Sequence, residues 1–205
     1  MPRTGFMMIA AALLGSTAAN AASALSLPHS LARVSAAEFA QRVTVEADPL
    51  MQTVALSTRK AGTPEGPSHA VLVSDAHARA VIDTRSDRPS FQVWHEFEYD
   101  GKLAEIAAVH YSVAGTTHKA KPIGLDQWLS NCGPDSGGCY GATRVGFELP
   151  SAHLHAIAAS HAPLSREPWL IEFEDKAGKR LSIGFAPAEL AGLSQAHERW
   201  RAAGK

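Results

Sequence analysis

The sequence predicts a mainly β protein, either an antiparallel β-sandwich or a curved sheet of about eight to ten strands. We also expect a C-terminal α-helix and a short helix near residues 152–160. Three features indicate this class. Short stretches of alternating apolar and polar residues recur along the chain, clusters of Gly, Pro and Asp separate them, and an apolar stripe of helical spacing follows near the end.

The first segment has the features of a secretory signal peptide. Arg3 precedes an apolar run over residues 6–15, which is shorter than the ~20 residues that a membrane-spanning helix needs. Ala19 and Ala21 supply the small side chains typical of a signal-peptidase site. We therefore expect residues 1–21 to be cleaved during export to the periplasm or the medium, leaving no transmembrane segment. An uncleaved anchor is the alternative.

The rest of the chain is expected to form one folded unit. Residues 22–42 form an N-terminal segment with a short helix from about residue 36, because Ser35 and Glu38 have the spacing of a capping box. Residues 43–205 form a single β-rich domain. The 19 Lys and Arg are balanced by 20 Asp and Glu, which disfavours nucleic acid as a partner. We expect an envelope protein or a small ligand instead, and no cofactor.

The stretch from residue 91 to 113 carries the strongest alternation. In its first strand His95 lies on the apolar face and Trp94 on the more polar face. Asp100-Gly101 offers a turn, so the stretch is interpreted as a long hairpin. A three-residue loop would place His95 opposite Glu105, whereas a two-residue loop would oppose two glutamates. The first register is therefore preferred.

The remaining elements follow from the same patterns. Further strands are expected at residues 43–45, 51–58, 69–73, 78–83, 123–129 and 140–149, and a hairpin at residues 169–174 and 180–185. A final helix begins at Pro187. Its apolar stripe consists of Leu190, Leu193, His197 and Trp200. Trp128 and Trp169 are expected in the core.

The two cysteines predict a structural disulfide. Cys132 and Cys139 enclose the loop GPDSGG between two expected strands. Export would place them in an oxidising compartment, where such a loop can bring them within bonding range. A redox-active pair would need a closer spacing, and a metal site would need more ligands nearby.

Two features could serve a function. A His95–Glu105 pair on an apolar face could act in acid–base chemistry. A structural ion pair at the sheet margin is the preferred interpretation, because no cleft or substrate-positioning group can be identified. Trp94 could anchor a ligand or partner, or it could be covered by the C-terminal helix. His153 and His155 cannot bind one metal ion from a helix, since residues two apart point in different directions. No metal site is therefore expected.

Sequence motifs for catalysis are missing, including the nucleophile elbow, the zinc-protease helix and the nucleotide-binding loops. The favoured interpretation is an exported, non-catalytic binding or accessory protein of the bacterial envelope. One alternative is an exported hydrolase or lyase that uses His95 and Glu105, with His110 nearby. Another is a metal-handling protein that uses the histidines.

Overall fold

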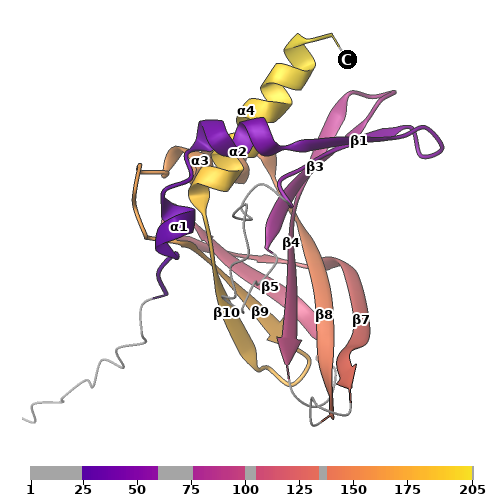
Figure 1. Ribbon diagram of the computed structural model, residues 1–205, viewed down its shortest axis with the longest axis vertical. Coiled ribbons are helices and arrows are strands. Elements are labelled where there is room, and N and C mark those ends of the chain that lie inside the picture. Colours follow the sequence, from indigo (N-terminus) through magenta and orange to yellow (C-terminus); the bar gives the residue numbers. More distant parts are fainter. Residues whose placement is uncertain (1–24, 60–75, 100–104, 134–137, 205) are drawn as a thin grey trace, which may run out of the picture.

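Two antiparallel sheets face each other across an apolar core (Figure 1), so the expected fold class is confirmed. The computed structural model describes residues 25–59, 76–99, 105–133 and 138–204, without the side chains of residues 97–99, 130–133 and 138–140. The expected strand at residues 69–73 lies outside these ranges. Residues 1–21 also lie outside them, so the signal peptide stays a prediction.

The larger sheet has six strands in the order β1-β2-β3-β4-β8-β7. Their bounds are β1 (Thr44–Asp48), β2 (Thr53–Ser57), β3 (His77–Asp83), β4 (Arg88–Tyr99), β8 (Gly138–Leu149) and β7 (Pro122–Gly133). The smaller sheet has the order β10-β9-β5-β6. Its strands are β10 (Arg180–Phe185), β9 (Trp169–Asp175), β5 (Ile106–Val113) and β6 (Thr116–Ala120). Lys121 alone separates β6 from β7, so the chain passes there from an edge of one sheet to an edge of the other.

The core lies between the two sheets and follows from their alternating sequences. The larger sheet contributes Val93 and Phe147, and the smaller sheet contributes Val109, Ile171 and Phe173. Each of these side chains is almost fully buried, while their neighbours along the strand point away from the core. We use "outer face" for the side of the larger sheet that is turned away from the smaller one.

The expected hairpin over residues 91–113 does not form. β4 pairs with β3 and β8, whereas β5 pairs with β6 and β9 in the other sheet. His95 therefore lies opposite Val145 of β8, and its ring stacks on Phe173 of the facing sheet at 5.6 Å. Glu105 is exposed and forms an ion pair with Lys176. The prediction of a His95–Glu105 pair is thus wrong.

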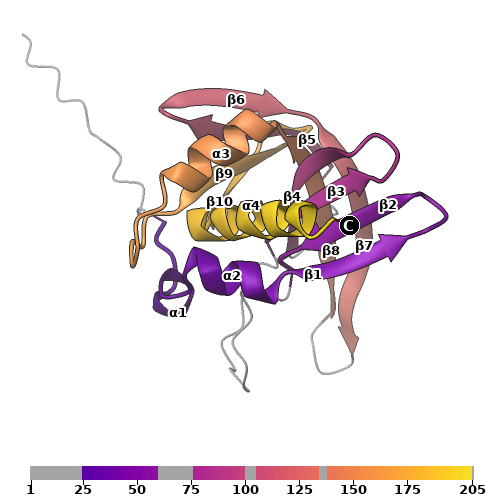
Figure 2. The ribbon, with the colours of Figure 1, turned by 90° about the horizontal axis from the view of Figure 1, so that it is seen from above.

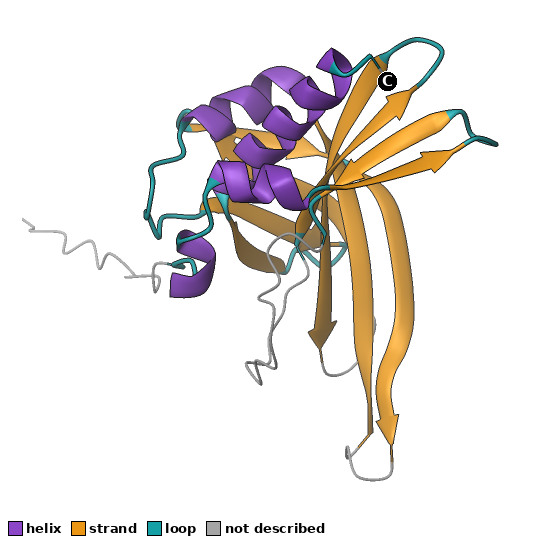
Figure 3. Cartoon of the chain, turned by 45° about the horizontal axis from the view of Figure 1, so that its top comes forward, coloured by secondary structure: helices purple, strands orange, loops and turns teal. Residues whose placement is uncertain are grey.

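Four helices, α1 (His29–Ala32), α2 (Ala36–Arg42), α3 (Ser151–Ala159) and α4 (Pro187–Ala202), gather at one end of the sandwich (Figures 2 and 3). α2 begins with the expected capping box between Ser35 and Glu38. It packs closely on α4, because a Cβ at Gly192 would lie 2.4 Å from Cβ of Phe39. α4 buries Leu190 and Leu193 in the core. Within the described ranges, no helix combines the length and apolar character that crossing a bilayer requires.

The cysteines occupy neighbouring strands. Cys132 belongs to β7 and Cys139 to β8, and these strands pair as far as Gly133 opposite Gly138. Both cysteine side chains lie outside the described residues, so the disulfide stays a prediction.

Candidate functional site

An apolar pocket of about 630 Å³ lies between the helical end and the smaller sheet. Its walls come from five parts of the chain: the segment through α1, the end of β5, the second half of α3, the connection from α3 into β9, and the start of α4. These parts lie in four separate stretches of the sequence, residues 27–32, 112–114, 156–170 and 186–188, so the pocket exists only in the folded chain. Its volume is within the ~300–1,000 Å³ typical of small-molecule sites.

Trp169 forms the rigid part of the pocket wall. It is the first residue of β9 and is 7% exposed. Its indole Nε1 donates a hydrogen bond to the carbonyl oxygen of Ser112 in β5 at 2.8 Å. Its ring contacts Tyr111 at 5.7 Å and Phe185 at 6.0 Å, both edge to face. The indole is therefore fixed on its polar and apolar sides before any ligand binds.

The N-terminal segment forms the opposite wall. Leu27 is buried and lines the pocket together with Leu31 of α1. Arg166 holds this segment in place: its backbone oxygen accepts from Leu27 N at 2.9 Å, and its Nε donates to Leu27 O at 2.8 Å. Its Nη2 also donates to the hydroxyl of Ser26 at 3.0 Å. A short segment without sheet pairing of its own is thereby tied to the rest of the fold.

Many of the side chains that line the pocket are small, and their size leaves room for a ligand. Alanines line the pocket from α1, from α3, from the connection after α3 and from the start of α4. The lining alanines of α3 and of the connection after it, Ala156, Ala159 and Ala162, are exposed, whereas Ala186 and Ala188 are buried. Ala156 is exposed and Leu170 is 48% exposed at the rim, so the pocket opens to solvent.

Few polar groups face the pocket, and some are already used. Ser160 Oγ donates to Ile157 O at 2.7 Å, and Ser165 Oγ accepts from Glu167 N at 3.2 Å. The imidazole of His161 is half-buried at the lining and makes no hydrogen bond within the described residues. The pocket therefore suits a mainly apolar molecule with one polar end.

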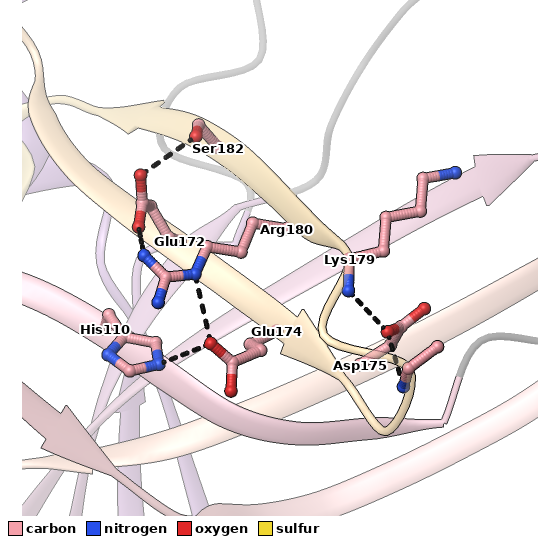
Figure 4. A network of polar contacts seen from close by, with 8 residues as sticks. His110, Glu172, Glu174, Asp175, Lys179, Arg180 and Ser182 are labelled. Atoms are coloured by element: carbon pink, nitrogen blue, oxygen red, sulfur yellow. Dashed lines mark hydrogen bonds and ion pairs between the residues drawn. The ribbon is translucent and has the colours of Figure 1, made fainter.

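A second cluster lies on the solvent side of the smaller sheet (Figure 4). Arg180 donates from Nε to Glu174 Oε2 at 3.0 Å and from Nη1 to Glu172 Oε2 at 3.2 Å. His110 Nε2 lies 3.3 Å from the same Glu174 oxygen but is not aligned for a hydrogen bond. Desolvation raises the pKa of Glu174, but the hydrogen bond and charge of Arg180, together with the charges of His110 and Lys119, lower that pKa below its ordinary value.

This cluster contains a histidine–glutamate pair, His110 with Glu174, that differs from the expected pair of His95 with Glu105. None of its members lines the pocket. Exposed ion pairs of this kind contribute little to stability, and a general acid–base site also needs a substrate-binding cleft beside it. The cluster is therefore a surface ion-pair network in our interpretation.

His153 and His155 of α3 point in different directions, as the helix geometry predicts. His153 faces inward, where its Nδ1 lies 3.0 Å from the hydroxyl of Tyr111 and its ring 4.3 Å from that of His118. His155 is exposed, and its Nδ1 contacts Ser151 O at 2.7 Å. In the part of the chain that the structure describes, no three His, Cys, Asp or Glu side chains are grouped to hold a metal ion.

The tryptophans divide differently from expectation. Trp169 lies in the core as predicted, but Trp128 is half-buried and belongs to neither core cluster. Trp94 lies on the outer face, as the alternation predicts, where its ring packs over Gly146 and Gly124 of neighbouring strands. α4 packs on the opposite side of the sheet and does not cover it.

Sequence reasoning missed the pocket. Its only local signal is the alanine-rich sequence of α3 and the following connection, which by itself indicates a helix. Comparison with known proteins adds nothing to the assignment: no family model, no curated protein and no solved structure matches the chain significantly.

Proposed function

We propose that this chain is an exported, non-catalytic protein of the bacterial envelope that binds a small, mainly apolar ligand with one polar end. The pocket between α1, α3, α4 and Trp169 is the observation that carries this proposal. Export is supported by the signal-peptide features of residues 1–21.

The expected binding mode follows from the pocket lining. Alkyl groups of the ligand replace water against alanine, leucine and the Trp169 ring, and each buried CH₂ contributes about 0.8 kcal/mol. The polar end of the ligand faces His161 at the lining. The dissociation constant should therefore fall about fourfold with each added CH₂ until the pocket is filled.

The test is calorimetric titration of the chain lacking residues 1–21 with a graded series of straight-chain fatty acids and the matching alcohols. Ala156→Trp should abolish binding, because this exposed residue of α3 lines the pocket. Ala152→Trp is the matched control: Ala152 is also an exposed alanine of α3, one turn earlier, and does not line the pocket.

Each outcome is decisive for the pocket. Chain-length-dependent binding that Ala156→Trp removes and Ala152→Trp leaves intact supports the proposal. Absence of binding for the whole series, or equal binding by both variants, contradicts it.

A further inference from the structure

On the outer face of the larger sheet, two glycines leave a space in which an aromatic ring packs against the backbone. Trp94 of β4 lies directly opposite Gly146 of β8, which in turn lies opposite Gly124 of β7. A Cβ at Gly146 would lie 2.6 Å from Cδ2 and Cε2 of the indole, and one at Gly124 would lie 2.6 Å from Cη2. The indole therefore lies across two neighbouring strands, in a space that only glycine leaves open.

The polar edge of this indole is also fixed. Its Nε1 donates to Gln92 Oε1 at 3.0 Å, and the guanidinium of Arg79 lies over the ring, 6.0 Å from its centroid. Glycine in a strand costs about 0.5–1 kcal/mol relative to alanine. Here the half-buried indole fills the space that the two paired glycines leave, which offsets that cost.

A second indole lies farther along the same face. Trp128 follows Gly124 by four residues on β7, so the two positions share a face and lie about 13 Å apart along the strand. The guanidinium of Arg144 lies 5.4 Å from the Trp128 ring centroid. Its Nη2 also donates to Glu96 Oε2 at 2.8 Å. Two aromatic surfaces are thus separated by a row of donors and acceptors.

Among the described side chains, Arg59, Arg79 and Arg144 are balanced by Glu96, Asp126 and Glu148 at this face. The register places Asp126 and Glu96 on either side of Arg144, and Arg79 opposite Gln92. Phosphate-rich partners select an excess of Lys and Arg, which is absent from this row. A partner that fits must offer flat apolar surfaces for the indoles together with groups that both donate and accept hydrogen bonds.

Pyranose sugars have this combination, since one face of the ring presents C–H groups and the rim presents hydroxyls. The negatively polarised face of an indole attracts such C–H groups, and hydroxyls can pair with guanidinium donors and carboxylate acceptors alike. We propose that the outer face of β4, β8 and β7 binds a neutral polysaccharide, with Trp94 and Trp128 stacking on its sugar rings. This site is separate from the pocket.

The test is calorimetric titration of the shortened chain with cellohexaose, chitohexaose and maltohexaose, and cosedimentation with insoluble cellulose and chitin. Trp128→Ala should weaken binding of the preferred glycan at least about tenfold. The control is Trp200→Ala, which removes the same side chain from α4. Asp126→Ala is a second variant, because this exposed side chain can be removed without unfolding the sheet, and it should weaken binding about threefold.

Glycan binding weakened at least about tenfold in Trp128→Ala and about threefold in Asp126→Ala, with binding unchanged in Trp200→Ala and in the pocket variant Ala156→Trp, supports the inference. It is overturned if the unmodified chain binds none of these glycans, or if the outer-face variants bind as well as the control. Binding of heparin but not of the neutral glycans would also overturn it. Because Ala156→Trp affects only the pocket, failure of the proposed ligand and failure of the glycan site give different results.

Discussion

Replacing Gly146 by alanine should change stability in opposite directions depending on whether Trp94 is present. The added Cβ would lie 2.6 Å from two indole atoms and 2.9 Å from a third, well inside the ~3.5–4.0 Å of a favourable carbon–carbon contact. The indole must therefore leave its position over the sheet. Overpacking of this kind costs about 1–3 kcal/mol.

The greater strand propensity of alanine offsets part of this overpacking cost. Alanine in a strand is about 0.5–1 kcal/mol better than glycine, so Gly146→Ala alone should lower the free energy of unfolding by about 0–2.5 kcal/mol, with a central value of about 1 kcal/mol. In a Trp94→Ala background the ring is gone and only the strand term remains. The same substitution should then raise the free energy of unfolding by about 0.5–1 kcal/mol.

Urea unfolding of the four variants, followed by far-ultraviolet circular dichroism, measures this coupling without using tryptophan emission as the signal. Gly124→Ala should repeat the pattern, since its Cβ would lie 2.6 Å from the far edge of the same ring. If Gly146→Ala has the same effect in both backgrounds, the indole does not lie over the glycines. The packing of Trp94 over the two glycines, on which the proposed glycan site depends, would then be absent.

Three further outcomes are expected from single contacts. Tyr111→Phe should lower the free energy of unfolding by about 1 kcal/mol in urea titrations, because it removes the hydroxyl contact with His153; an unchanged midpoint would contradict that contact. Burial lowers the pKa of His197, so the unfolded chain binds the proton first, and stability should fall with pH below about 6.5. His197→Gln should flatten that fall, and equal slopes would refute it. Reduction of a Cys132–Cys139 disulfide should cost roughly 2–3 kcal/mol and add two hydrogens to the intact mass, whereas an unchanged mass would show free thiols.

The course of β4 and β5 shows where sequence patterns stop being informative. Alternation correctly places His95 on the buried face and Trp94 on the outer face. Alternation does not reveal which strand pairs with which. The apolar faces of β4 and β5 would be buried if the two strands paired in one sheet, and they are buried equally well when the strands belong to two sheets that face each other. Strands joined by a short connection usually pair with each other, which favours one sheet. In this chain β4 and β5 lie in different sheets.

α2, α3, α4 and the hairpin of β9 and β10 could be predicted because their signals are local, whereas α1 was not predicted. Ser35 and Glu38 form the expected cap, and Pro187 is the first residue of α4. The pocket could not be predicted, because Leu27, Trp169 and the alanines of α3 meet only through long-range packing. The prediction that Trp128 lies in the core was wrong for a related reason. The face on which Trp128 lies depends on the register of β7 against β8, and irregularities in β7 shift that register.

The central claim is that the pocket holds an apolar ligand, and native mass spectrometry tests it most directly. The chain lacking residues 1–21, with its Ala156→Trp and Ala152→Trp variants, would be incubated with a bacterial lipid extract, separated from free lipid and measured under non-denaturing conditions. We expect the unmodified chain and Ala152→Trp to carry one small molecule that is released on denaturation, and Ala156→Trp to carry none. A bare unmodified chain, or the same added mass on all three proteins, would contradict the account.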